Sequence, residues 1–330
     1  MEKHVSILVP DGAAVLGCIE GALKTFRIAN VFLEAQDRPP RFSISLVALT
    51  KAPRTYDGFF TVQPDATIAS VKRTDLIIVP PVNGNMDEVV KMNEAFFPWI
   101  RQQHAQGAEV ASLCVGAFLL AATGLLDEKK CSTHWSAEHL FRSMFPSVDL
   151  TSDKVITDEE GIYSSGGANS FWNLLLYLVE KYVDRAMAVT IAKYYEIEID
   201  RRSQASFFMF KGQKEHEDPQ VRKVQEYIEQ NFAERITVAE LAEMAALSRR
   251  NLERRFKKAT SNTVVEYIQR VKIESAKLKL ESTDENINDV MYGTGYTDTK
   301  AFRTTFKKIT GLSPVQYRAK YHRLAPDVGM

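Results

Sequence analysis

The chain has 330 residues, of which 45% are apolar and 25% are charged, and its 42 lysine and arginine residues balance 42 aspartate and glutamate residues. This composition is typical of a globular protein of roughly two domains, and it excludes a disordered or fibrous chain. No apolar run approaches the roughly 20 residues of a membrane span. The cysteines Cys18, Cys114 and Cys131 are too few and too irregularly spaced for a disulfide framework or a zinc site.

The zero net charge hides an asymmetry between the two ends of the chain. From Asp218 onward, 20 lysine and arginine residues outnumber 15 aspartate and glutamate residues, whereas the preceding part is acidic. A basic segment beside an acidic one fits a nucleic-acid module joined to another domain, although ordinary domains also reach such an excess. The N-terminus has neither the apolar stretch nor the cleavage site of a signal peptide, so we expect a cytoplasmic protein without membrane contact.

The first two hundred residues alternate between strand-like and helix-like patterns. Short apolar runs predict strands at Val5–Val9, Phe42–Leu49, Asp75–Val79, Val110–Leu113 and Ile162–Ser165. Apolar residues at helical spacing predict helices at Glu20–Leu33, Glu88–Gln106, Gly116–Gly124, Ser170–Tyr182 and Asp184–Ile197. This alternation predicts a parallel sheet covered by helices on both faces, which is a flavodoxin-like doubly wound α/β domain over residues 1–210.

A polar segment at residues 211–219 contains Gly212 and Pro219 and no apolar residue, so we expect a linker there. Just before it, Arg201, Arg202 and Gln204 are expected to order the junction. Nearly everything after it has helical patterns, which predicts an all-α domain over residues 220–330. The predicted helices cover residues 220–231, 237–245, 248–259, 263–281, 286–293 and 298–309.

The helical part contains an internal repeat. The segment Ser248–Lys258 returns as Asp298–Lys308 at an offset of 50 residues. In each copy a short helix, a tight turn and a second helix that begins at a capping residue predict a helix-turn-helix unit. Leu252 and Phe256 share one face of the second helix in the first copy, and Phe302 and Phe306 replace them in the second copy.

The opposite face of each second helix is cationic. At about 100° per residue, this face carries Arg250, Arg254, Lys257 and Lys258 in the first copy, and Lys300, Arg303, Thr304, Lys307 and Lys308 in the second copy. Such a helix can pack on its own domain while it lies in the DNA major groove. A solvated basic face would explain one copy, but two copies in register favour DNA reading. The helix at Val264–Glu281 then acts as a rigid spacer that holds the two reading helices about one DNA turn apart.

The second copy carries a specific signature. Gly295, Phe302, Phe306, Ser313-Pro314 and Tyr317-Arg318 stand at spacings that resemble AraC/XylS-type transcription regulators, over about Val221 to Arg318. In the first copy, Ser261 and Val264 stand where glycine and proline are common. The resemblance implies double-stranded DNA as partner and activation more often than repression, so RNA polymerase is a further expected partner. It also implies base contacts from Arg250, Glu253, Arg254, Thr299, Lys300 and Arg303.

In the first domain a cysteine stands at a strand-to-helix turn. Cys114 follows the strand Val110–Leu113, near a helix N-terminus whose partial positive charge favours a thiolate. This arrangement is a nucleophile elbow with sulfur in place of a serine oxygen. Three interpretations stay open: a small residue that fits a tight turn, a ligand-pocket or redox-sensitive thiol, and a working nucleophile. His134 with Trp135 is expected to pack and hydrogen-bond rather than to catalyse.

This stretch, with Thr133-His134-Trp135 and Ser164–Asn169, resembles the ThiJ/PfpI-like class I amidotransferase domain, over about Lys3 to Phe210. Enzymes of that superfamily place a carboxylate beside the cysteine. We assign that position to Gly17, with Glu20 in the wrong register, so acid–base support for covalent chemistry is missing. We therefore expect no enzyme and no cofactor, and we expect Cys114, His134 and Gly17 to contribute to an effector site.

The two resemblances together predict a homodimeric transcription regulator, in which a sensor domain at residues 1–210 binds a small metabolite and residues 220–330 bind DNA. The resemblance suggests nitrogen-containing metabolites as effectors. One alternative is a cysteine-dependent hydrolase or deglycase-like enzyme with accessory DNA binding. Another is an architectural DNA binder without sequence preference.

Overall fold

The computed structural model describes residues 2–56, 58–199, 201, 203–214 and 216–322, in two compact units, Met1–Gln204 and Ala205–Met330. The sequence predicts a boundary at residue 210 and a linker at 211–219, whereas the chain joins the second unit from Ala205. The Phe210 amide donates to the Glu274 carboxylate (3.0 Å), and the Gln225 amide donates to the Gln213 carbonyl (2.9 Å). These hydrogen bonds attach Phe210, just before the expected linker, and Gln213 within it to the helices. Arg202, Glu215 and residues 323–330 of the predicted regions lie outside the described residues.

Among the described residues of the first unit, a seven-stranded sheet has the order β12-β13-β9-β7-β1-β3-β6. Neighbouring strands are parallel except for β12 and β13, which form an antiparallel hairpin through Gly161 (φ 84°). The predicted parallel sheet is confirmed for these other pairs, and the edge hairpin makes it mixed. The strands are β1 (Lys3–Leu8), β3 (Phe42–Ala48), β6 (Ala66–Thr67), β7 (Leu76–Val79), β9 (Glu109–Ser112), β12 (Ile156–Glu159) and β13 (Ile162–Ser165).

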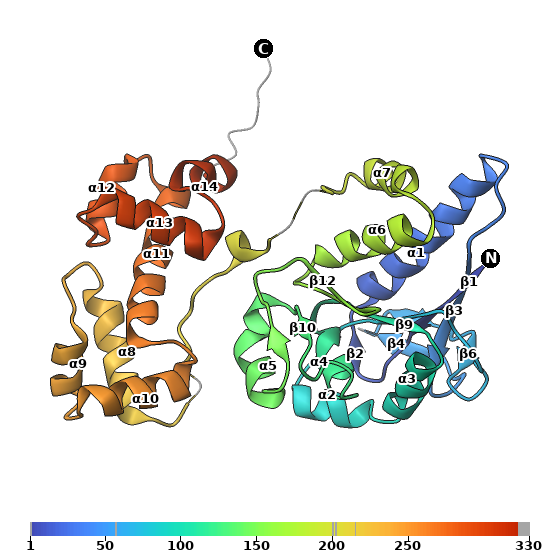
Figure 1. The fold of residues 1–330 in the computed structure, drawn as a ribbon, viewed down its shortest axis with the longest axis horizontal. Helices are drawn as coiled ribbons and strands as arrows, with labels where there is room; N and C mark the ends of the chain where they lie inside the picture. Colours follow the sequence, from blue (N-terminus) through green and yellow to red (C-terminus); the bar gives the residue numbers. More distant parts are fainter. Residues whose placement is uncertain (1, 57, 200, 202, 215, 323–330) are drawn as a thin grey trace, which may run out of the picture. The chain divides into compact units, whose positions relative to one another are not determined.

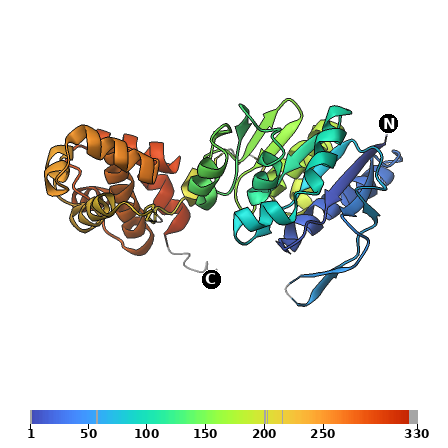
Figure 2. The ribbon, with the colours of Figure 1, turned by 90° about the horizontal axis from the view of Figure 1, so that it is seen from below.

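Helices cover both faces of this sheet (Figure 1). One layer contains α1 (Leu16–Glu34), α6 (Ser170–Tyr182) and α7 (Arg185–Tyr194), and the other contains α2 (Met86–Met92), α3 (Phe96–Ala105), α4 (Ala117–Ala121) and α5 (Glu138–Met144). Three short strand pairs complete the unit, and the β4–β5 hairpin stands away from the remainder of it (Figure 2). The three pairs are β2 (Ala13–Ala14) with β8 (Val82–Asn83), β4 (Arg54–Tyr56) with β5 (Phe60–Val62), and β10 (Lys130–Cys131) with β11 (Asp149–Leu150).

The prediction of a single helix at Glu88–Gln106 is wrong, because the structure has two helices there, α2 and α3. Asn93 ends α2, and its side chain bonds the loop after β1 by accepting from the Asp11 amide (2.8 Å) and donating to the Asp11 carbonyl (3.0 Å). Pro98 then lies in the first turn of α3, where a missing N–H group is tolerated. Apolar periodicity continues across the break, so the pattern alone does not reveal it.

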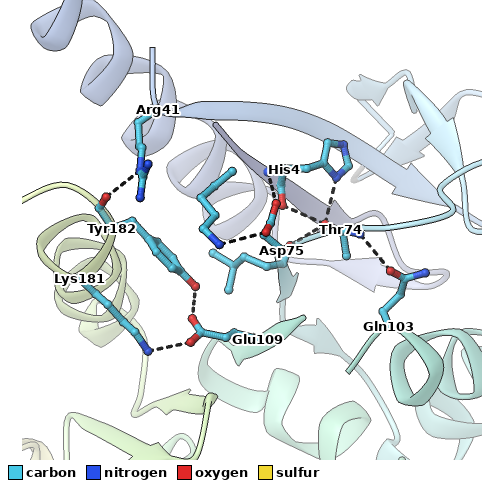
Figure 3. Close-up of polar contacts among 10 residues, drawn as sticks. His4, Arg41, Thr74, Asp75, Gln103, Glu109, Lys181 and Tyr182 are labelled. Carbon is cyan, nitrogen blue, oxygen red and sulfur yellow. Dashed lines mark hydrogen bonds and ion pairs between the residues drawn. The ribbon is translucent and has the colours of Figure 1, made fainter. Parts of the chain in front are cut away.

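A polar network ties together the amino ends of the central strands (Figure 3). Asp75, just before β7, accepts from the Lys3 ammonium (3.0 Å) and from the His4 amide (2.9 Å) of β1. Glu109 at the start of β9 pairs with Lys181 of α6 (2.8 Å) and accepts a hydrogen bond from Tyr182. The opposite, carboxyl edge of the sheet is left for the loops that follow β9 and β13.

In the described part of the second unit, the regular elements are all helices. Its helices are α8 (Pro219–Asn231), α9 (Val238–Met244), α10 (Arg249–Thr260), α11 (Val264–Ser282), α12 (Ile287–Gly293), α13 (Thr299–Thr310) and α14 (Pro314–Tyr321), preceded by the short 3-10 helix η3 (Ala205–Phe207). The helices predicted from the sequence are present, and α14 was not predicted. Within the part of the chain that the structure describes, no helix is long and apolar enough to cross a membrane.

The helical unit has two separate apolar cores joined by α11 (Figure 1). Val264 and Tyr267 at the start of α11 belong to the core of α8, α9 and α10, while Ile273 and Leu280 further along belong to the core of α12, α13 and α14. A helix buried at both ends in different cores is a stiff connector. The helix predicted as a spacer is therefore present, and each helix-turn-helix unit packs around its own end of it.

Lys272, midway along α11, also joins the two helix-turn-helix units. Its ammonium lies 3.3 Å from the Glu234 carbonyl of the first helix-turn-helix unit and 3.4 Å from the Gly295 carbonyl of the second helix-turn-helix unit. Gly295 has a φ of +73°, and a Cβ atom there would lie 2.1 Å from the Ala233 carbonyl oxygen. Only glycine allows this close approach. The two helix-turn-helix units are therefore fixed directly against each other as well as through α11.

Candidate nucleic-acid interface and effector site

The reading face of α10 is exposed. Ser248 caps the helix by accepting from the Asn251 amide (3.3 Å), and Leu252 and Phe256 are fully buried in the first core. This burial fixes the rotation of the helix and turns the other side outward. Arg250, Glu253, Arg254, Lys257 and Lys258 are all exposed on that side. The structure thus brings together every residue predicted for the first reading helix.

These five side chains line an open groove of about 670 Å³ together with Val238 of α9 and the residues Thr263, Val264 and Val265. Thr263 caps α11 in a reciprocal capping box with Glu266. The groove therefore joins cationic side chains to the first turn of a second helix. A concave cationic surface beside a helix N-terminus suits a phosphate backbone, because lysine and arginine neutralise phosphate and the helix dipole places partial positive charge at the N-terminus.

The second reading helix, α13, repeats this arrangement. Asp298 accepts from the Ala301 amide (2.6 Å), and Phe302 and Phe306 are fully buried in the second core. Its exposed side carries Thr299, Lys300, Arg303, Thr304, Lys307 and Lys308. Both helices also end alike, with Ser261 and Gly311 in the left-handed conformation. The repeat found in the sequence is therefore a repeat in three dimensions.

Two of the cations in α10 are held in local pairs. Arg249 lies 3.1 Å from Glu253, and Arg254 donates to the Asn251 side chain (3.0 Å). The neighbouring Arg255 points elsewhere, because its guanidinium binds Asp218 at the start of α8 (2.6 Å). Arg255 is thus a structural residue, whereas Arg250, Lys257 and Lys258 are exposed cations directed toward solvent.

In the first unit, Cys114 is the first residue of the 3-10 helix η1 (Cys114–Gly116), at a strained turn just after β9. Its φ is +54°, and its amide donates to the Ser165 hydroxyl (3.2 Å) at the end of β13. A Cβ atom on Gly116 would lie 2.5 Å from the Val79 carbonyl oxygen, so the turn packs tightly against β7. Burial raises the pKa of the Cys114 thiol, although the amides of Val115 and Ala168 donate to the sulfur and oppose this shift.

Both halves of the chain have known relatives. Residues 241–320 match the helix-turn-helix domain family, and residues 30–181 match the DJ-1/PfpI family. Over 337 aligned residues the chain is 24% identical to the HTH-type transcriptional regulator CdhR of Pseudomonas aeruginosa, covering 99% of this chain and 94% of CdhR. It is 26% identical over 254 residues to the HTH-type transcriptional regulator GbdR of the same species, covering 77% and 68%.

The chain is an AraC-type helix-turn-helix transcriptional regulator with an N-terminal DJ-1/PfpI domain. Two solved structures share the fold of about three fifths of the chain. An AraC family transcriptional regulator from Pseudomonas putida has a TM-score of 0.50 at 18% identity, covering 59% of this chain and all of that one (100%). Drosophila melanogaster DJ-1beta has a TM-score of 0.51 at 16% identity, covering 60% and 100%.

In this regulator Cys18 lies near Cys114, whereas Gly17, the residue that the sequence suggested for that place, lies away from it. Gly17 lies exposed in the first turn of α1, and a Cβ atom there would meet nothing within 4 Å. Cys18 is buried and close enough to Cys114 for their charges to interact; burial, with the neighbouring thiol, raises its pKa to about 12. Sequence reasoning missed Cys18 because α1 begins at Leu16, four residues before the predicted start at Glu20.

The regulator places His134 beside the loop that holds Cys114. A Cβ atom on Gly167 would lie 2.5 Å from the His134 ring, and the amide of the next residue, Ala168, donates to the Cys114 sulfur. The His134 Nδ1 atom accepts from the Ser136 amide (3.1 Å), and burial lowers its pKa. None of the hydrogen bonds among the described residues joins His134 to Cys114. His134 therefore packs against Gly167 at the edge of this loop and hydrogen-bonds Ser136.

Proposed function

We propose that the regulator binds specific double-stranded DNA sites through α10 and α13, and that a small metabolite bound near Cys114 controls this binding. The duplicated reading face carries the proposal: each helix buries two apolar side chains in its own core and exposes a row of cations on the opposite side. Arginine in the major groove reads guanine bidentately, and lysine neutralises phosphate. The shared spacer α11 supports simultaneous insertion of both helices.

We further propose that the DJ-1/PfpI domain is a sensor and has no catalytic activity. In the described residues, the groups that shift the pKa of Cys114 include no carboxylate, and its nearby partner is the thiol of Cys18. A buried thiol with a raised pKa is a poor nucleophile. These features support a binding role for the loops around Cys114, at the carboxyl edge of the sheet where such folds hold ligands. Gly17, being exposed, is left out of this site.

The remaining parts of the proposal concern assembly and output. Paired sensor domains would raise the effective concentration of the reading helices on repeated half-sites, so we propose a homodimer. We propose a nitrogen-containing metabolite as effector, activation through contact with RNA polymerase as output, and the cytoplasm as the location. The relatedness to CdhR and GbdR supports a regulatory output.

Selection from a pool of random duplexes tests the proposal. The purified full-length chain is incubated with the pool at moderate salt, bound duplexes are recovered over several rounds, and the enriched sequences are compared. We expect one enriched motif that outcompetes random duplex by at least about a thousandfold, as specific sites do. Enrichment of no motif would contradict sequence-specific binding and favour an architectural role.

Turnover assays test the catalytic alternative. We expect ester, amide and glyoxal substrates to be consumed no faster by the wild type than by the Cys114→Ala variant, since burial raises the pKa of the thiol and disfavours the thiolate nucleophile. Substrate loss is followed by absorbance over hours at equal protein concentrations. Turnover that disappears in Cys114→Ala would show that the sensor domain is an enzyme.

A further inference from the structure

Gln204, the last residue of the first unit, is a buried side chain that holds the loops around Cys114. It is 1% exposed, and its amide nitrogen lies 2.9 Å from the Thr133 carbonyl and 2.7 Å from the Ser152 carbonyl. Its side-chain oxygen accepts from the Gly167 amide (2.7 Å). One amide group therefore bonds the loop after β10 and the loop after β13.

Both loops also contact Cys114. The Thr133 hydroxyl donates to the Cys114 carbonyl (3.1 Å), and the Ala168 amide, directly after Gly167, donates to the Cys114 sulfur. Gly166 approaches Gln204 so closely that a Cβ atom there would lie 2.5 Å from its amide nitrogen. A displacement of either loop must therefore displace Gln204, because tightly packed neighbours leave no free volume to absorb it.

The next six residues, Ala205–Phe210, form a segment that we name the connector strap, and this segment is packed on the helical unit. At its start it contacts the second helix-turn-helix unit. Tyr321 of α14 hydrogen-bonds Ser206 (3.2 Å) and packs edge-on against the Phe207 ring (6.3 Å between centroids). The Lys320 ammonium lies 4.8 Å from the centre of the Phe207 ring.

At its end the connector strap contacts the spacer and the first helix-turn-helix unit. Lys277 of α11, itself paired with Glu274 (2.7 Å), donates to the Phe208 carbonyl. The Phe210 amide donates to Glu274 (3.0 Å), and its ring packs edge-on against Tyr267 (5.0 Å) in the first core. The connector strap thus lies along α11 and touches the cores that support both reading helices.

We propose that Gln204 is a positioning residue that transmits the state of the Cys114 loops through the connector strap to both reading helices. The inference rests on the proposed function, and it names the route of regulation. Each end of the route is fixed by hydrogen bonds and ring contacts, and Gln204 is covalently bonded to Ala205. Coupling between two sites is reciprocal, so DNA on the reading helices must also change the stability of the Cys114 loops.

Hydrogen–deuterium exchange on the full-length chain, with and without an enriched duplex, tests this route without any effector. In the wild type we expect the duplex to slow exchange in the connector strap and at the amides of residues 166–168 by about fivefold or more, a typical size for such coupling. In Gln204→Glu, whose carboxylate cannot donate to the Thr133 and Ser152 carbonyls, only the connector strap should respond.

Gln103→Glu is the matched control. Gln103 is also 1% exposed and bonds two backbone groups of the same unit, accepting from the Thr74 amide (3.0 Å) and donating to the Lys72 carbonyl (3.1 Å) at the opposite edge of the sheet (Figure 3). A general loss of stability affects both variants, so Gln103→Glu should keep the wild-type response. Phe207→Ala is a second variant that breaks the route on the helical side and should also remove the response at residues 166–168.

The outcomes separate the two proposals. If the wild type binds the duplex and residues 166–168 do not respond, or if Gln204→Glu keeps the wild-type response, the inference is wrong while DNA binding stands. If Gln204→Glu does not fold, Phe207→Ala decides: a retained response overturns the route, and a lost response supports it. Failure of the wild type to bind any duplex contradicts the proposed function and, with it, the route.

Discussion

Cys114 has a left-handed backbone conformation that costs an ordinary residue about 1–2 kcal/mol. Tight packing of Gly116 against β7 and the bond to Ser165 hold it there. The strand-to-helix pattern predicts this turn from the sequence, because short apolar strands and helices have clear periodicities. The partner at Cys18 was not predictable in the same way, since the helical pattern begins at Glu20 and α1 itself begins four residues earlier, at Leu16.

His134 should make the sensor domain less stable in mild acid. Burial lowers its pKa from the ordinary 6.5, so the folded state favours neutral imidazole. Its stabilising contribution is therefore present above pH 6.5 and is lost as the pH falls through the lowered folded pKa. Protonation also converts Nδ1, which accepts from Ser136, into a donor.

His134→Asn checks this expectation, because asparagine retains a capping acceptor and does not titrate. The melting temperature of the full chain, followed by tryptophan fluorescence, should fall more steeply between about pH 6.5 and 5 in the wild type than in the variant. Parallel pH profiles would show that His134 does not contribute. Contributions from the other histidines, such as His4, are common to both proteins and cancel.

Ser261 and Gly311 allow a matched test of the two helix ends. Both have a left-handed conformation after the reading helix, with φ values of 58° and 76°. Ser261→Gly should stabilise the helical unit, and Gly311→Ser should destabilise it, each by about 1 kcal/mol. Urea unfolding of the full chain, followed by circular dichroism at 222 nm, measures both. Shifts of the same sign in the two variants would contradict this explanation.

At the scale of elements, the internal repeat and the capping residues predicted helix boundaries better than apolar periodicity alone did. The helix-turn-helix pairs follow from a duplicated pattern with capping residues at Ser248 and Asp298, and the structure confirms both. The break between α2 and α3 depends on Asn93 bonding a loop 82 residues away, which no local pattern contains. The edge strand β12 has only weak apolar alternation, so its pairing with β13 is visible only in three dimensions.

The reading helices should separate base contacts from phosphate contacts. Arg250→Ala and Arg254→Ala should each weaken binding to the enriched duplex by about 1–3 kcal/mol and relax the base preference at one position. Lys258→Ala, if it meets phosphate, should weaken all duplexes alike and lower the slope of log affinity against log salt by about one. Fluorescence anisotropy with enriched and random duplexes over a salt series measures both effects.

Arg255→Ala is a useful control for these variants. It removes the ion pair with Asp218 and leaves the exposed cations of α10 in place. We expect it to lower stability without changing base preference. Equal losses on enriched and random duplexes for Arg250→Ala and Arg254→Ala would show that the reading face has been assigned to the wrong side of the helix.

For the whole molecule, the proposed function depends on keeping two reading helices in a fixed relation. The spacer α11 is buried in both cores of the helical unit. Lys272 and Gly295 add a direct junction between the two helix-turn-helix units. The sequence indicated the spacer through its length and position between the repeats. It did not indicate the junction or the connector strap, because both depend on contacts between residues that are far apart in the chain.

Footprinting of the full-length chain on an enriched duplex tests the central claim most directly. Hydroxyl-radical cleavage should show two protected patches on one face of the duplex, about 10–10.5 base pairs apart, one helical turn. Replacing Arg250 and Arg254 with alanine should remove one patch, and replacing Lys300 and Arg303 with alanine should remove the other. A single patch, or equal weakening of both patches by either pair of substitutions, would contradict the account.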